Sequence, residues 1–231
     1  MTVADVLLAG LRAQIDPNTA AWLDGARRAS ADGPVTSLLR SYTEASRHLG
    51  RTPLALAPGD RAAHPELSRL PPNHLTLEDA GRLLLVLARY AATGPSPDYA
   101  AAAIDCYEQG DTGEQRSWLR TVALLPEPAR FLPVVIDACR TSIVPLFEAV
   151  ACENPYPAQH FPALNFNQMV LKALFNGIAL NRIVGLPSRL NPELSRMASD
   201  YADERRAAGR SIPGDISLAM LPGLAAQRTE L

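Results

Sequence analysis

Apolar residues recur at three- and four-residue intervals through most of the chain, a spacing that predicts amphipathic α-helices. In the first predicted helix, one face carries Val3, Val6, Leu7, Leu11 and Ile15. Similar segments follow, separated by short breaks that contain proline, glycine or capping residues. No segment alternates between apolar and polar positions as a half-buried strand does. The pattern therefore predicts an all-α protein, with further helices over residues 17–28, 34–49, 76–92, 97–109, 113–125, 129–140, 165–179 and 192–208.

Short breaks between helices favour antiparallel neighbours. We expect antiparallel helix pairs stacked in an irregular, HEAT-like right-handed α-α superhelix, although no residue signature recurs from pair to pair. We expect one domain over residues 1–210, made of N-terminal helices (1–50), a proline-rich crossing (51–75) and a helical core (76–210). Residues 211–231 form a C-terminal tail that is too apolar to be purely disordered, and it either packs back on the body or docks on a partner.

The proline-rich crossing interrupts the helical pattern. Prolines at positions 53, 58, 65, 71 and 72 exclude a long helix, because each would remove a backbone donor and clash one turn back. We expect an ordered loop with one short helix near residues 60–70. A flexible interdomain linker is the alternative, but it would leave Leu54, Leu56, Leu67 and Leu70 in water.

Composition indicates a globular protein with 47% hydrophobic and 20% charged residues, rich in the helix formers alanine and leucine. A net charge of −2 gives no electrostatic reason to expect nucleic acid. The three cysteines lie in helical contexts without CxxC spacing, so we expect buried thiols rather than disulfides. The N-terminus has no basic region like that of a signal peptide, and no apolar run reaches a membrane-spanning length. We therefore expect a cytoplasmic protein without direct membrane insertion.

Familiar catalytic signatures are missing from the sequence. It contains no glycine-rich phosphate loop, no GxSxG, no HExxH and no zinc-like Cys/His spacing. Three of the four histidines lie in or beside the proline-rich crossing, and only His160 lies in the segment 137–177, described next. We expect no catalytic set, no metal site and no cofactor.

The segment 137–177 places polar residues unusually deep in apolar sequence. In its second helix, Gln168, Lys172 and Asn176 recur every four residues and form one polar stripe, while apolar residues cover the rest of the circumference. Such a stripe is either a narrow solvent-facing strip or the lining of a groove. Lys172 is the only lysine in an arginine-rich chain, which favours the groove. It could also pair with Glu148 or Glu153.

The connection before this helix reads Glu153-Asn154-Pro155-Tyr156-Pro157. Two prolines fix their own φ angles and push the preceding residues toward extended backbone. The connection is either a simple corner between two helices or a rigid element that presents Asn154 and Tyr156 to a ligand.

Two runs are unusual enough to compare with known families: ENPYPAQHFPALNFNQMVLKALF, and NPELSRMASDYADERRAAGR near the last helix. On these runs the chain resembles the EboA family, closely over residues 110–212 and more weakly over the N-terminal helices and the helix at 76–92. Residues that match the family run are Arg140, Glu153, Asn154, Tyr156, Phe161, Asn167, Gln168 and Lys172, and more weakly Arg205 and Arg206.

This resemblance implies a role in metabolite traffic. Family members are encoded beside a prenyltransferase-like membrane protein, a sugar-phosphate cyclase and hydrolase- or isomerase-like enzymes, in a cluster associated with moving a metabolite precursor toward the cell envelope. No catalytic residues are assigned to the family, so the resemblance carries none over to this chain.

We hypothesise a non-catalytic component of a bacterial metabolite-traffic system. It would bind a small-molecule metabolite or another protein of the cluster in a groove beside helix 165–179. The alternatives are an enzyme acting on a prenyl or aromatic metabolite, with Lys172 central, and a scaffold for the other cluster proteins. The candidate binding residues are Arg140, Glu153, Asn154, Tyr156, His160, Asn167, Gln168, Lys172 and Asn176.

Overall fold

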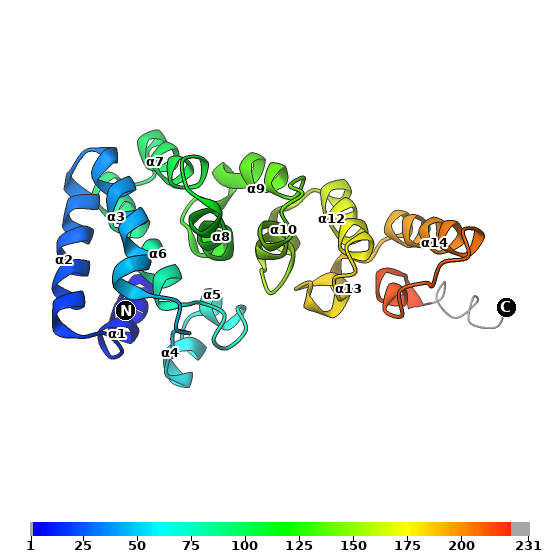
Figure 1. The fold of residues 1–231 in the computed structure, drawn as a ribbon, viewed down its shortest axis with the longest axis horizontal. Helices are drawn as coiled ribbons and strands as arrows, with labels where there is room; N and C mark the ends of the chain where they lie inside the picture. The colour runs from blue at the N-terminus through cyan, green and yellow to red at the C-terminus, as the bar shows by residue number, and fades with distance from the viewer. Residues whose placement is uncertain (1, 223–231) are drawn as a thin grey trace. The chain divides into compact units, whose positions relative to one another are not determined.

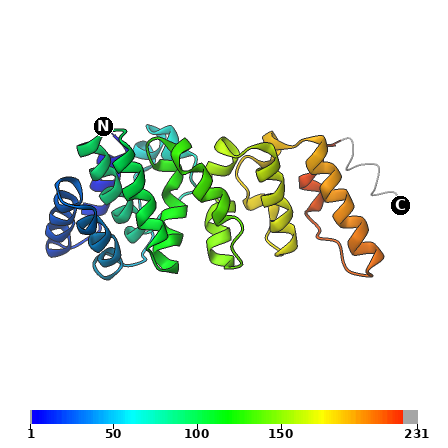
Figure 2. The same ribbon diagram turned by 90° about the horizontal axis from the view of Figure 1, so that it is seen from above.

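The computed structural model describes residues 2–222. Over these residues the chain forms fourteen α-helices, four 3-10 helices and no strand, which confirms the all-α prediction (Figures 1 and 2). The chain divides into two compact units, Met1–Ala138 and Cys139–Leu231, which we call the N-terminal unit and the C-terminal unit. The HEAT-like superhelix and the single domain over residues 1–210 stay predictions.

Three helices open the N-terminal unit: α1 (Val3–Arg12), α2 (Pro17–Asp32) and α3 (Val35–Leu49). The Thr2 hydroxyl accepts a bond from the Asp5 N–H, while the Asp5 carboxylate accepts one from the Thr2 N–H, so a capping box starts α1. The Asp16 carboxylate caps α2 in front of a proline at the first helical position. These boundaries follow local capping chemistry, as the sequence predicts.

The proline-rich crossing contains two short helices, α4 (Pro58–Ala62) and α5 (Pro65–Ser68), where one was predicted. Each begins with a proline, which explains the split, because a proline is tolerated in the first turn but ends a preceding helix. Backbone hydrogen bonds from Leu54 N to Leu75 O (2.8 Å) and from Leu77 N to Thr52 O (2.9 Å) join the two ends of the crossing. The crossing is ordered, and Leu54, Leu67 and Leu70 are buried.

Helix α6 (Leu77–Thr93) lies at the centre of the N-terminal unit and packs against α1, α2, α3, α7 and α8 (Figures 1 and 2). Every residue from Leu77 to Val86 is buried. Around it lie α7 (Pro97–Glu108), α8 (Thr112–Thr121), η1 (Val122–Leu124), η2 (Pro128–Phe131) and α9 (Leu132–Ala138). The helices predicted at 113–125 and 129–140 are thus each divided into an α-helical and a 3-10 part.

Buried charges accompany the apolar core of this unit. Glu78 and Arg82, 1% and 3% exposed, face each other one turn apart on α6, with 3.3 Å between Glu78 Oε2 and Arg82 Nη1. Arg51 approaches the other Glu78 oxygen at 3.2 Å, and Arg82 Nε donates to the carbonyl of Tyr42 at 3.0 Å. Asp79 pairs with Arg120 at 3.0 Å. An ion pair removed from water is tolerated only while both partners remain.

The C-terminal unit contains five α-helices and two 3-10 helices within the described residues. They are α10 (Val144–Ala151), α11 (Tyr156–His160), α12 (Ala163–Phe175), η3 (Leu180–Arg182), α13 (Leu186–Arg189), α14 (Pro192–Ala207) and η4 (Ile216–Ala219). Helix α10 begins at Val144, and Pro145 lies in its first turn. Helix α12 ends at Phe175, four residues before the predicted end.

The described part of the C-terminal tail packs back onto its own unit. Ile216, Ala219 and Met220 are buried, and the backbone N–H of Leu221 donates to the Ser195 hydroxyl at 3.0 Å. Residues 223–231 of the predicted tail lie outside the described residues. The sequence left two alternatives for the tail, packing back on the body or docking on a partner. Residues 211–222 pack back on the body.

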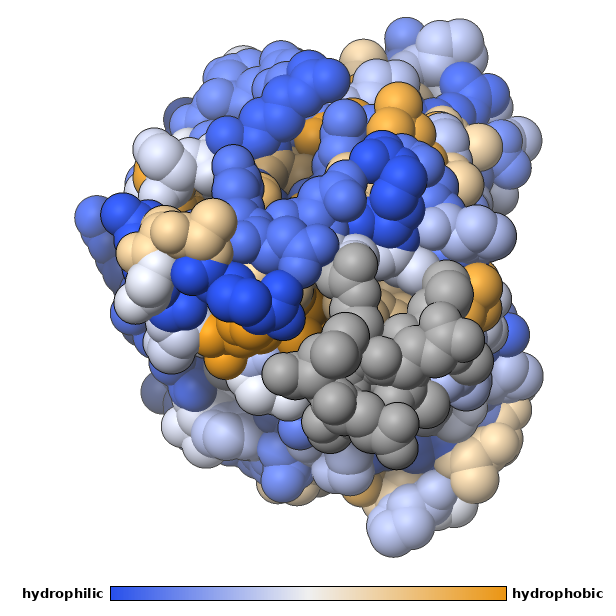
Figure 3. Space-filling view, turned by 90° about the vertical axis from the view of Figure 1, so that its right-hand side faces the viewer, coloured by the Kyte–Doolittle hydropathy of each residue, from blue (hydrophilic) through white to orange (hydrophobic). Residues whose placement is uncertain are grey.

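Exposed side chains are mostly polar on the face drawn in Figure 3, where apolar residues show only in small separate areas. Within residues 2–222, no helix has both the length and the apolar character needed to cross a membrane.

Glu78→Ala tests the buried charges of α6. We expect it to lower the free energy of unfolding by about 3–5 kcal/mol, because Arg82 would stay buried without its carboxylate partner. Urea denaturation of the full chain followed by circular dichroism measures this change. The matched control is Glu193→Ala, which removes an exposed pair with Arg196 and should cost below about 1 kcal/mol. Equal losses in the two variants would contradict a special role for the buried pair.

Candidate ligand groove in the C-terminal unit

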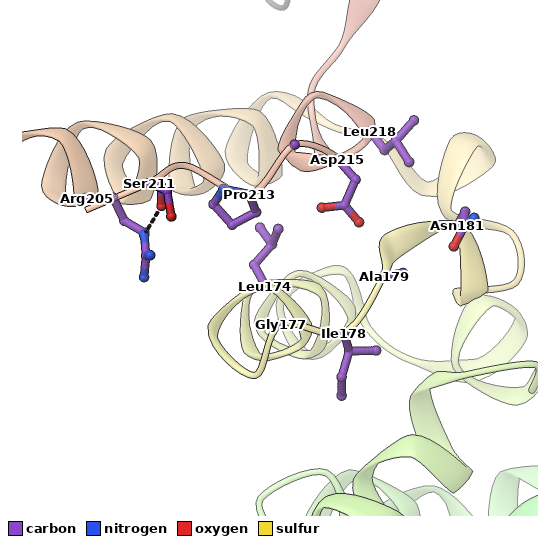
Figure 4. A pocket seen from close by; sticks show the side chains of 11 residues that line it. Leu174, Gly177, Ile178, Ala179, Asn181, Arg205, Ser211, Pro213, Asp215 and Leu218 are labelled. Carbon is purple, nitrogen blue, oxygen red and sulfur yellow. Dashed lines mark hydrogen bonds between the residues drawn. The ribbon is translucent and has the colours of Figure 1, made fainter. Parts of the chain in front are cut away.

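A groove of about 560 Å³ opens in the C-terminal unit where the end of α12, the η3 turn, α14 and the tail meet (Figure 4). Its volume is within the range of small-molecule sites. The groove is lined by Leu174, Gly177, Ile178, Ala179, Asn181, Arg205, Ser211, Pro213, Gly214, Asp215 and Leu218. It therefore lies at the C-terminal end of α12, the helix predicted at residues 165–179.

The end of α12 shapes the first wall. Gly177 has a φ of +68°, a left-handed conformation that glycine adopts without steric cost. The N–H of Ile178 donates to Ala173 O at 2.9 Å, and the N–H of Gly177 donates to Leu174 O at 3.1 Å. This pair of bonds is the Schellman motif, which stops the helix and turns the chain. As a result Leu174 and Ile178 both contribute apolar surface to the groove.

The tail forms the opposite wall. In Figure 4, Pro213 and Asp215 project from the returning chain toward the end of α12, and Leu218 follows on η4. Asp215 Oδ2 accepts a short hydrogen bond, 2.6 Å, from the backbone N–H of Leu180. At the other end, Arg205 Nε donates to Ser211 O at 2.6 Å. The two hydrogen bonds hold the tail at both ends of the groove.

The groove combines apolar walls with two charged side chains. Leu174, Pro213 and Leu218 supply apolar wall, and Leu218 is 45% exposed. Asp215 and Arg205 supply the two charges, and no ion pair joins them. An apolar surface with a few fixed polar groups is the usual composition of a site that binds a small organic molecule.

Arg182 fixes η3, from which Asn181 faces the groove. Its guanidinium bonds both oxygens of Glu153, at 2.8 and 2.9 Å, and also reaches Glu148 at 3.2 Å. The N–H of Glu153 donates to the Arg182 carbonyl at 2.8 Å. These bonds to Glu153 raise the pKa of the Arg182 guanidinium. Glu153 therefore supports η3 through Arg182 and does not itself line the groove.

The residues after Glu153 are buried within the corner that they form. Asn154 is 1% exposed; its amide Nδ2 donates to Ala149 O at 2.9 Å, and its Oδ1 accepts from Tyr156 N at 3.0 Å. Tyr156 is fully buried, and its ring lies 4.6 Å from that of His160. Burial lowers the pKa of His160. In this structure the corner is packed rather than presented to a ligand.

The polar stripe of α12 divides into exposed and engaged residues. Gln168 and Asn176 are exposed. Lys172 Nζ donates to two backbone carbonyls, Cys139 O and Thr141 O, each at 2.6 Å, and lies 4.9 Å from the centre of the Phe147 ring. Its ammonium group therefore holds the segment that leads into α10. It forms no ion pair with Glu148 or Glu153, which pair with Arg182 instead.

Asn167 and Arg140 complete the set of candidate residues. Asn167 is buried and exchanges amide hydrogen bonds with Asn191, at 3.1 and 3.0 Å, while Asn191 caps α14. Arg140 is exposed in the turn before α10. None of the nine candidates lines the groove, so their role in binding stays a prediction.

Groove residues were not among the predicted site residues. Arg205 matches the family run only weakly, and no pattern in the sequence marks Asn181 or Asp215 as binding residues. The available signal was the sequence Pro213-Gly214-Asp215 inside an apolar tail, because a turn there can bring a carboxylate back onto the body.

The family assignment rests on a match to the model described as metabolite traffic protein EboA, which covers residues 3–220. The chain belongs to the EboA family. The match confirms the resemblance and spans nearly the whole chain. Neither the curated proteins nor the solved structures include a significant match to this EboA-family chain.

Lys172→Met tests the structural role of the single lysine. It keeps most of the bulk and removes the charge, so two backbone carbonyls lose their donor. We expect the free energy of unfolding to fall by about 1.5–3 kcal/mol, the value of hydrogen bonds from a charged donor. The matched control is Gln168→Met, an exposed position one turn earlier on α12. Chemical denaturation measures both, and a Lys172→Met protein as stable as the control would refute the fastening role.

Proposed function

We propose that this EboA-family protein is a non-catalytic metabolite carrier or presenter, which holds a small molecule in the groove between α12, η3, α14 and the tail. The family description supports the metabolite-traffic setting. The observation that carries the proposal is the groove itself, about 560 Å³ with apolar walls and isolated polar groups. Its position beside α12, the helix predicted at residues 165–179, supports the proposal.

A binding role fits the groove chemistry better than catalysis does. Nucleophilic catalysis by Lys172 would require a free amine at a substrate site, but its ammonium donates to two carbonyls and is not part of the groove lining. The two charged groove residues, Asp215 and Arg205, make no hydrogen bond to each other that could pair an acid with a base. Proteins encoded beside family members are the partners to which a carrier would deliver its metabolite.

Leu218→Trp tests the groove as a metabolite site. Leu218 is a partly exposed wall residue, so a larger ring there narrows the groove with little disturbance of the core. The purified full chain would be equilibrated with a small-molecule extract of its source cells, washed, and its bound compounds identified by mass spectrometry. We expect a specific compound to be retained by the original protein and reduced at least about tenfold in the variant, equivalent to about 1.4 kcal/mol of binding free energy.

Leu164→Trp is the matched control for that experiment. Leu164 is also an exposed leucine of the C-terminal unit, at the start of α12, but it does not line the groove. Retention should be unchanged in this variant. Recovery of the same compounds from Leu218→Trp, or of none from the original protein, would overturn the proposed function.

A further inference from the structure

We propose that the groove selects small molecules that carry a positively charged nitrogen next to an apolar body, with Asp215 as the recognition residue. This inference rests on the proposed function, since it names the chemical class of ligand for the same groove. It begins from the charge arrangement around Asp215 in the C-terminal unit.

Asp215 is a groove carboxylate without a cationic partner among the described residues. It accepts one hydrogen bond, from the Leu180 N–H to Oδ2, and no described lysine, arginine or histidine lies within ion-pair distance. Other carboxylates of this unit do have arginine partners. Glu148 and Glu153 pair with Arg182, and Glu193 pairs with Arg196. In Figure 4 the Asp215 carboxylate points into the space between the tail and the end of α12.

The end of α12 adds negative potential at the same place. Leu174 and Gly177, at the C-terminal end of this thirteen-residue helix, both line the groove. The C-terminus of a helix carries a partial negative charge of about half an elementary charge, which stabilises a nearby cation. Asp215 and the helix end therefore favour the same sign of ligand charge.

Arg205, the positive group of the groove, is engaged in holding the protein together. Its Nε donates to Ser211 O at 2.6 Å, Nη1 lies 3.4 Å from the Tyr201 hydroxyl, and the guanidinium stands 5.8 Å from the centre of the Tyr201 ring. It also lies in the last turn of α14, where a basic residue offsets the helix dipole. An anion would have to compete with Ser211 and Tyr201 for this side chain. A cation would meet an Asp215 carboxylate whose Oδ1 accepts no hydrogen bond from the described residues.

The apolar body of the proposed ligand would pack against the apolar walls of the groove, which are formed by Leu174, Pro213 and Leu218. They lie on the walls around Asp215, so a cation that presented only an ammonium group would leave this surface in water. Burying an apolar body against them adds roughly 25 cal/mol for each Å² removed from water. A simple metal cation or a free ammonium ion has no apolar surface to bury and would not gain this binding free energy.

Three probes that share one apolar body test the charge preference: phenethylamine, 2-phenylethanol and 3-phenylpropionate. Dissociation constants would be measured with the full chain by ligand-detected NMR titration at pH 7 and low salt. We expect phenethylamine to bind at least tenfold more tightly than 3-phenylpropionate, with 2-phenylethanol between them.

Asp215→Asn assigns that preference to the carboxylate. The amide oxygen of asparagine can still accept the Leu180 N–H, so the variant should keep its fold, and thermal unfolding checks this. We expect the amine preference to shrink to within about twofold. The matched control is Asp200→Asn, an exposed residue of α14 that pairs with Arg196 and does not line the groove. This control should keep the full preference.

The outcomes separate the inference from the proposed function. If 2-phenylethanol binds and Leu218→Trp weakens it, but the amine has no advantage or Asp215→Asn retains the advantage, then the groove binds small molecules and the charge inference is wrong. Tighter binding of 3-phenylpropionate would also overturn the inference and assign recognition to Arg205. If none of the three probes binds to the folded protein, both the inference and the proposed function fail.

Discussion

The groove exists because the chain beyond α14 turns back and is fastened to η3 by a single carboxylate. The bond from the Leu180 N–H to Asp215 joins two segments that are far apart in sequence. Without it, the wall that carries Pro213 and Leu218 would have no polar attachment to η3. The Arg205–Ser211 and Leu221–Ser195 hydrogen bonds and the buried contacts of the tail would attach it to the rest of the unit, but none of these bonds reaches η3. A hydrogen bond to a charged acceptor contributes about 1.5–3 kcal/mol, enough to decide whether so short a segment is ordered.

Cationic side chains in the C-terminal unit bind backbone carbonyls as well as acids. Arg189 donates to Ala158 O at 2.5 Å and to Phe161 O at 2.7 Å, and Lys172 bridges Cys139 O and Thr141 O. The difference in residue type has a physical reason. The carbonyls around Arg189 suit a planar fork, whereas two carbonyls that converge on one point suit a compact ammonium group. The single lysine of the chain is therefore explained by coordination geometry, with no need for a titrating amine.

Helix ends were the part of the fold that sequence could predict best. A capping box starts α6, because the Thr76 hydroxyl accepts a hydrogen bond from the Asp79 N–H and the Asp79 carboxylate accepts one from the Thr76 N–H. These residues, like the prolines at the starts of α2 and α14, act within one turn, so the sequence contains all of the relevant information. The buried pair Glu78–Arg82 was not predictable. Its four-residue spacing is also that of an ordinary surface ion pair, and only packing of α6 by five other helices removes it from water.

The candidate site also combines contacts between residues close in sequence, which sequence can predict, with contacts between distant segments, which it cannot. The location beside helix 165–179 was predicted from its polar residues, yet those residues lie on the solvent side or bind backbone, and the groove adjoins the apolar end of the helix. Asn154 and Tyr156 form a corner whose bonds are local. The Asp215–Leu180 and Arg205–Ser211 bonds depend on the path of the tail, which no periodicity encodes.

In the proposed carrier, the two oxygens of Asp215 would link order in the tail to occupancy of the groove. One oxygen holds Leu180 and the other faces the ligand space, so a cation that binds only when the tail is docked must stabilise the docked tail by the same factor. Ligand binding and docking of the tail on η3 would then stabilise each other by the same factor. A partner that pulled residues 211–222 away from η3 would lower the affinity for the cargo, and release would need no separate gate.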